Sequence, residues 1–130
     1  DNGTTPLYTA AQKGHTDVVS LLIGGGAALN QARTDDGMSP LFIAAEHGYV
    51  SIVALLVECG TDTNQCIPRV GWSPLFVAAW SGHAEVVRIL LTAGAHKTVA
   101  TTAVHFDVEA KCTPMSIAVR LGHSEISEQF

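Results

Sequence analysis

The 130-residue sequence has few charged and few aromatic side chains, which make up 15% and 6% of the chain. Lysine and arginine together number only seven and are scattered, whereas binding to nucleic acid or to an anionic membrane requires clustered cations. We therefore expect no nucleic acid and no membrane among the partners. The net charge of −5 fits a basic partner better, although a charge of this size serves mainly solubility.

Cysteines are also few, and long apolar runs are absent. The three cysteines form an odd, widely spaced set, which argues against a disulfide framework and for a reducing compartment. Uninterrupted apolar stretches such as residues 52–57 are far too short to span a membrane. The first residues show no charged segment followed by an apolar one, so we expect no signal peptide. We predict an intracellular, cytoplasmic protein, with the nucleus as an alternative.

The motifs of common catalytic, metal and phosphate sites are missing as well. The sequence contains no Cys-x-x-Cys or His-x-x-x-His spacing, no phosphate-binding glycine loop and no Gly-x-Ser-x-Gly turn. His96, His105 and Cys112 could meet across the inserted loop, but we favour the interpretation that their grouping arises by chance. We predict no enzymatic activity, no cofactor and no metal site.

The sequence does contain a fourfold internal repeat. Four segments align without gaps, starting at Thr4, Met38, Trp72 and Cys112: TTPLYTAAQKGH, MSPLFIAAEHGY, WSPLFVAAWSGH and CTPMSIAVRLGH. Their prolines are spaced by 34, 34 and 40 residues, so the last connection is longer than the others. In each copy a Thr or Ser precedes the proline and can cap a short helix, and a glycine ends that helix.

A second, more apolar helix follows in each complete copy, and its apolar pairs and triples form one wide face. One such helix pair cannot bury this face alone, but stacked pairs can. We therefore predict an all-α solenoid of stacked helix-turn-helix units, joined by β-turn or hairpin loops. The single domain has units at about 1–33, 34–67, 68–107 and 108–130; the last is incomplete, and a loop is inserted near 99–111.

These strings resemble ankyrin repeats, whose pattern Thr-Pro-Leu-His-x-Ala-Ala-x-x-Gly-His and following apolar helix cover nearly the whole chain. At the position of the family's histidine after Pro-Leu, this sequence has Tyr8, Phe42, Phe76 and Ser116. Where the residue is aromatic, we expect packing to take the place of the histidine's hydrogen bonds. Lys111 stands where the family has a turn glycine, which predicts that the insertion remodels the fourth turn. Residues 24–26 are all glycine and predict a weakened end of the first apolar helix. Neither end of the array looks like a polar capping unit.

The resemblance implies a module that binds another protein through a groove formed by the turns and the first helices. Carried over position by position, the central partner-binding residues are Asp35, Asp36, Met38, Glu46, His47, Arg69, Val70, Trp72, Trp80 and Ser81. The two tryptophans are either contacts that dominate binding or side chains that fill a gap in the groove. If Trp72 contacts the partner, its removal should leave thermal stability nearly unchanged.

Other roles remain open at this point. Alternatively, the stack is a structural spacer or a self-association segment of a longer protein. Self-association would occur through weak contacts between the uncapped ends of two copies. The inserted segment with Val104, His105 and Phe106 is either a recognition finger or a loop that folds back on the stack. Asn30 and Asn64 stand at the asparagine position that ends each repeat, which can be hydroxylated in ankyrin arrays. Either these residues are hydroxylated, or their side chains form hydrogen bonds within their own turns.

Overall fold

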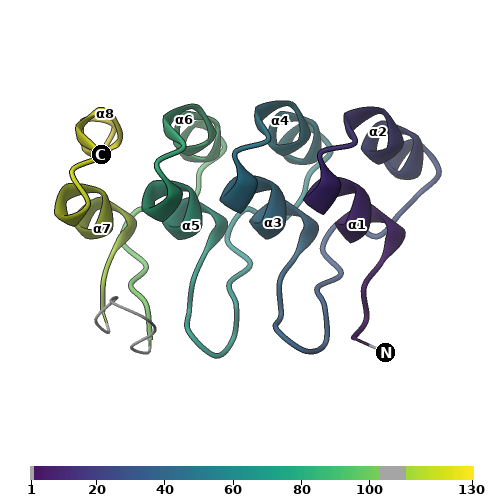
Figure 1. The fold of residues 1–130 in the computed structure, drawn as a ribbon, viewed down its shortest axis with the longest axis horizontal. Coiled ribbons are helices and arrows are strands. Elements are labelled where there is room, and N and C mark those ends of the chain that lie inside the picture. Colours follow the sequence, from purple (N-terminus) through teal and green to yellow (C-terminus); the bar gives the residue numbers. More distant parts are fainter. Residues whose placement is uncertain (1, 103–110) are drawn as a thin grey trace.

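In a computed structural model, which describes residues 2–102 and 111–130, the chain is a row of four helix pairs (Figure 1). The inner helices are α1 (Pro6–Lys13), α3 (Pro40–His47), α5 (Pro74–Ser81) and α7 (Pro114–Arg120). The outer helices are α2 (Thr16–Gly24), α4 (Val50–Glu58), α6 (Ala84–Thr92) and α8 (Ser124–Ser127). The described residues form no strand, and the prediction of an all-α stack is confirmed. Residues 104–106 of the inserted loop, and with them His105, lie outside the described residues.

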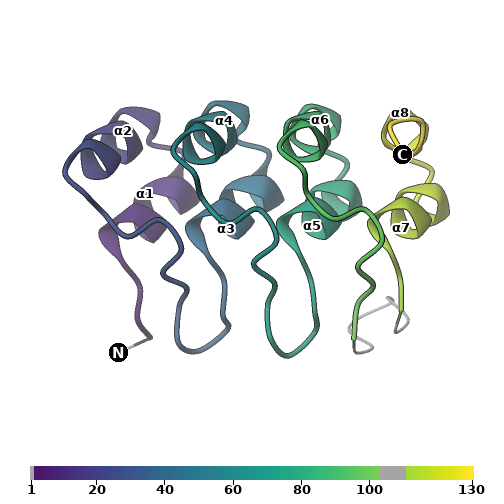
Figure 2. The same cartoon turned by 180° about the vertical axis from the view of Figure 1, so that it is seen from behind.

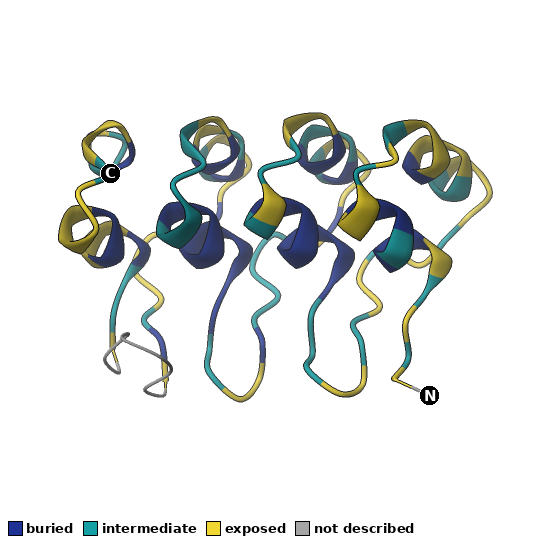
Figure 3. Ribbon diagram, in the orientation of Figure 1, coloured by how far each residue is buried: buried dark blue, intermediate teal, exposed yellow. Residues whose placement is uncertain are grey.

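The pairs stand side by side in chain order, and the inner helices lie between the outer helices and the connecting turns (Figures 1 and 2). Each inner helix packs on the next one, and the outer helices form a second, looser row. Burial is most extensive in the two central units, where all but the last two residues of α3 and of α5 are buried (Figure 3). The turns project from the inner helices on the side opposite the outer row.

The inner helices begin as the sequence predicts. The side-chain oxygens of their N-cap residues each accept a hydrogen bond from the backbone N–H three positions later; these residues are Thr5, Ser39, Ser73 and Thr113. Proline follows directly, where its missing N–H costs no helical hydrogen bond. Three of the helices end at a glycine in the left-handed conformation, and these are Gly14, Gly48 and Gly82. Short-range sequence signals therefore set the boundaries of α1, α3 and α5, whereas α7 ends at Arg120 with Leu121 as its C-cap, before the expected glycine.

The aromatic residues at the family's histidine position lie in the core. Tyr8, Phe42 and Phe76 are buried in successive units, as are the alanines at the centre of their helices. Packing thus replaces the expected hydrogen bonds in the second and third units. Tyr8 keeps a polar role, because its hydroxyl accepts a hydrogen bond from Nη1 of Arg33 at 3.5 Å.

The base of the fourth turn keeps the geometry of the others, whereas the predicted remodelling by the insertion also concerns residues 103–110, which lie outside the described residues. Lys111 has φ +69°, close to +78° at Gly37 and +71° at Gly71. Its N–H donates to the Thr101 oxygen at 2.8 Å, and the Thr101 N–H donates to the Cys112 oxygen at 2.9 Å. Similar bonds close both central turns. Hydrogen bonds at the base therefore hold a lysine in a conformation that glycine adopts more easily.

The glycines at residues 24–26 do not shorten the first outer helix. Helix α2 has nine residues, as do α4 and α6. Gly24 is its last residue, and a glycine with positive φ follows the helix here as it does after α4 and α6. The predicted weakening therefore does not appear as lost helical length.

Apolar side chains are exposed at both ends of the stack. Leu21 of α2 is 76% exposed and Val18 is 44% exposed, while at the other end Val119 of α7 is 59% exposed. Helix α7 carries exposed residues on its side away from α5 (Figure 3). Among the described helices, none combines the length and the apolar character that crossing a membrane requires.

Candidate partner-binding surface

Neighbouring turns contact one another and form a continuous edge of the stack. The Thr34 N–H donates to the Asn2 oxygen at 2.8 Å, and the Thr102 N–H donates to the Val70 oxygen at 3.0 Å. The equivalent residue between the two central turns is Pro68, which has no N–H to donate. Its ring instead packs on Gly37, where an added Cβ would lie 2.6 Å from the proline Cδ. The central turns are therefore joined by close packing at this point.

A second set of contacts holds the inner helices in register. Nε2 of His83 donates to the Glu46 oxygen at 2.9 Å, and Nε2 of His123 donates to the Trp80 oxygen at 3.3 Å. The two imidazole rings also cover Gly48 and Gly82 of the preceding units. These histidines thus have packing roles.

The closing asparagines connect each unit to the next. Oδ1 of Asn30 accepts hydrogen bonds from Oγ1 of Thr61 and the N–H of Asp62, both at 2.8 Å. Oδ1 of Asn64 likewise accepts one from the His96 N–H at 2.8 Å. The alternative in which each asparagine bonds within its own turn is therefore wrong for these oxygens. Hydroxylation of Asn30 and Asn64 stays a prediction.

In the first central turn, Arg33 forms ion pairs with both Asp35 and Asp36, two of the predicted contact residues. Nη2 of Arg33 lies 2.5 Å from Oδ2 of Asp35, and its Nη1 lies 3.0 Å from Oδ2 of Asp36. The guanidinium also lies over the Tyr8 ring, 5.3 Å from its centroid. Burial of the Tyr8 hydroxyl raises its pKa. Oδ1 of Asp36 accepts the Met38 N–H at 2.9 Å. Sequence reasoning missed Arg33, although its position two and three residues before the acids was a usable signal.

The tryptophans form a tilted stack that runs from the core to the surface. The Trp72 ring centroid lies 5.1 Å from that of Phe76 and 5.5 Å from that of Trp80. Trp72 is only 9% exposed, whereas Trp80 is partly exposed. Burial favours the interpretation of Trp72 as a packing residue, whose removal we expect to lower stability.

The ten predicted contact residues differ in how far they reach the solvent. Those exposed are Asp35, His47 and Arg69. Those partly exposed are Asp36, Met38, Glu46, Val70, Trp80 and Ser81. Trp72 alone among the ten is buried. We call the exposed part of the two central turns and of the C-terminal ends of the inner helices the inner surface.

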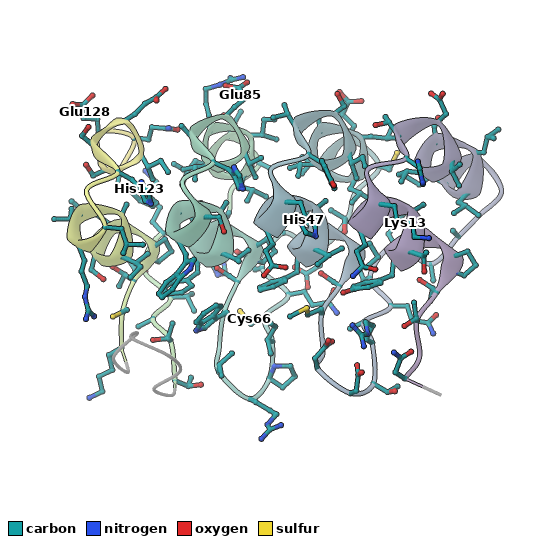
Figure 4. The ribbon with its side chains drawn as sticks, in the orientation of Figure 1. Lys13, His47, Cys66, Glu85, His123 and Glu128 are labelled. Atoms are coloured by element: carbon teal, nitrogen blue, oxygen red, sulfur yellow. The ribbon has the colours of Figure 1, made fainter. Side chains whose placement is uncertain are left out.

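Charges are divided between the two sides of the stack. The described cations on the inner helices and turns are Lys13, Arg33, Arg69, Lys111 and Arg120, and the carboxylates there are Asp35, Asp36 and Glu46. The outer helices and the residues that follow them carry Asp17, Glu58, Asp62, Glu85, Glu125 and Glu128 with the cations Arg88 and Lys97. In Figure 4, Glu85 and Glu128 lie at the outer edge, and Lys13 and His47 lie at the ends of inner helices. The acidic excess that favoured a basic partner is therefore on the outer side of the described structure.

The described parts of the chain contain no candidate metal-binding cluster. No group of three or more His, Cys, Asp or Glu side chains there could hold a metal ion. The three cysteines are free thiols, and burial raises the pKa of Cys66. Glu85 and Arg88 form an exposed pair on an outer helix, and the hydrogen bond from Arg88 lowers the pKa of Glu85.

Comparison with known families agrees with this architecture. A family model for ankyrin repeats in three copies matches residues 1–66 and 34–101. No curated protein matches the chain significantly. The fourth helix pair follows the matched region and repeats the N-cap of its inner helices and its turn base. The matched residues make up most of the sequence, and the chain belongs to the ankyrin-repeat family.

Proposed function

We propose that this chain binds another protein through the inner surface. Ankyrin repeats generally mediate protein–protein interactions and are typically not enzymes. The observation that carries the proposal is the pair formed by Trp80, partly exposed, and Trp72, buried beneath it at 5.5 Å. Tryptophan is enriched among the residues that dominate binding energy, especially where its ring is held rigidly.

The scaffold below Trp80 is well suited to hold its ring in place. Its backbone oxygen is bonded to His123 of the next unit, and its helix packs between α3 and α7. A side chain positioned before binding loses less rotamer freedom when the partner arrives. The turns add the exposed side chains of Asp35 and Arg69 beside this helix row. We propose these turn residues, with Glu46, His47 and Ser81, as the remaining contacts.

Site-specific photo-crosslinking tests this proposal. A photoreactive amino acid replaces Ser81, beside Trp80, and in a matched control it replaces Arg88 on outer helix α6. In cells that express the chain, we expect a discrete protein adduct from position 81 that disappears when Trp80→Ala is added. The control position should give no such adduct. Adducts of equal yield from both positions, or an adduct that does not depend on Trp80, would contradict the proposal.

We further propose that the chain works inside the cell. All three thiols are free, although Cys59 is exposed and open to oxidation. Free thiols of this kind persist in reducing compartments. Fractionation of cells that express the tagged full-length protein would test this, and recovery from the secreted fraction would contradict it.

Self-association is a second candidate function, which the ends of the stack favour. Val18 is exposed, whereas its equivalents in the next three units are fully or almost fully buried against the preceding unit; these are Ile52, Val86 and Ile126. At the other end, Met115 and Val119 are also exposed. A second copy that stacks end to end would cover both faces with the packing already used inside the array.

A further inference from the structure

We propose that the partner offers the inner surface a linear segment with an apolar anchor between a cationic and an anionic residue. The anchor packs on Trp80, the cation faces Glu46 on the α3 side, and the anion faces Arg120 on the α7 side. This inference rests on the proposed function and adds the chemistry and polarity of the segment that is bound.

The three side chains occupy one row across three neighbouring helices. Glu46, Trp80 and Arg120 are each six residues beyond the proline that begins α3, α5 and α7. The backbone oxygens of Glu46 and Trp80 also have equivalent partners, because each accepts a hydrogen bond from a histidine of the following unit. Helix α5 packs against both α3 and α7. The row therefore places an aromatic ring between a carboxylate and a guanidinium.

Neither charge of this row is neutralised by the described part of the protein. The ion pairs within residues 2–102 and 111–130 join Arg33 to Asp35 and Asp36, and Arg88 to Glu85. Arg120 is exposed and Glu46 is partly exposed. A segment of a single charge sign would bring a like charge to one end of the row, which is unfavourable. A segment with one charge of each sign would pair both.

The spacing of the helices sets the spacing of the charges in the segment. Packed helix axes lie about 8–10 Å apart, so two steps from Glu46 to Arg120 cover roughly 16–20 Å. An extended chain rises about 3.3 Å per residue, and the cation and the anion should therefore be roughly five or six residues apart. The apolar anchor is expected near the middle. A helical segment would need about twice as many residues for the same span.

Selection from a random peptide library against the whole chain tests the inference. Displayed peptides of about twelve residues are long enough to span the row when extended. We expect enriched peptides with an apolar residue between a basic and an acidic one. Trp80→Ala should weaken these peptides by about thirtyfold. Glu46→Lys and Arg120→Glu should each weaken them by up to about fivefold. Peptides selected on the double reversal should carry the opposite polarity.

Matched charge changes on the outer side are the control. Glu58→Lys and Lys97→Glu alter exposed residues away from the row and should leave the affinity within about twofold. Peptides that need Trp80 but carry one charge sign, or ignore both reversals, would overturn the inference and leave the proposed function standing. A selection that returns no peptide dependent on Trp80 would overturn both. Unchanged unfolding curves for the charge variants exclude misfolding as the cause.

Discussion

The rings of Trp72 and Trp80 lie 5.5 Å apart and tilted by 33°, yet they belong to different environments. Trp72 is buried against Phe76, and Trp80 is partly exposed at the end of α5. One ring therefore supports the other from within the core. This separation of roles leads to opposite expectations for the two substitutions.

Trp72→Ala should lower the free energy of unfolding by about 3–5 kcal/mol, because it removes a large side chain and leaves a cavity. Urea unfolding followed by circular dichroism measures this loss. Trp80→Ala is the comparison and should cost clearly less, since part of that side chain is already in water. If the Trp72→Ala protein were as stable as the original, the packing role of Trp72 would be wrong and the interpretation as a contact residue would be favoured.

Gly37→Ala should destabilise the protein for two reasons. The residue has φ +78°, and the new Cβ would lie 2.6 Å from Cδ of Pro68. The left-handed conformation alone costs a residue with a side chain about 1–2 kcal/mol. Gly60→Ala is a matched control, with φ +88° and no atom within 4 Å of its added Cβ.

The difference in unfolding free energy between these two variants isolates the contact with Pro68. Gly37→Ala should be the less stable one, and Pro68→Ala in the same chain should restore part of the loss. Equal stability of Gly37→Ala and Gly60→Ala would mean that the two turns separate easily at this point.

Lys111→Gly should raise the thermal midpoint or leave it unchanged. Relief of the left-handed conformation at φ +69° contributes about 1–2 kcal/mol. The greater freedom of glycine in the unfolded chain offsets about 0.5–1 kcal/mol of that gain. Arg69→Gly, in a turn residue without a positive φ, is the control and should lower the midpoint. Destabilisation by both substitutions would show that the Lys111 side chain itself is needed.

Sedimentation velocity over a wide concentration range tests end-to-end association. If the exposed ends stack, the weight-average sedimentation coefficient should rise with concentration, and Leu21→Ser with Val119→Ser should abolish that rise. Val50→Ser, at an exposed apolar residue of an internal unit, is the control and should leave it intact. A single monomeric species at every concentration rules out the second candidate function.

The repeat made much of the architecture predictable from local signals. Ser39 and Ser73 cap helices whose first residue is proline, and these interactions span three residues of chain. The apolar faces of the outer helices follow from side-chain periodicity, so the need for stacking also follows from the sequence. The geometry at the base of the fourth turn was not predictable, because the bonds between Thr101, Lys111 and Cys112 join residues on both sides of an insertion.

For the candidate surface, the sequence and the structure differ in what they reveal. The family pattern predicted which turns and helix positions would contact a partner, and both tryptophans were among them. Burial depends on how the chain packs in three dimensions, so sequence alone did not separate Trp72 from Trp80. The pairing of Arg33 with Asp35 and Asp36 also depends on how the turn folds over Tyr8.

By itself, the sequence determined the repeat, its helices, their caps and the family, because these depend on residues close together along the chain. The tertiary structure decided which aromatic ring reaches the surface and how Glu46, Trp80 and Arg120 form one row. It also decided that the acidic excess of the described chain lies on the outer side. The row joins residues 34 or more positions apart, which only the packing of one unit on the next brings together.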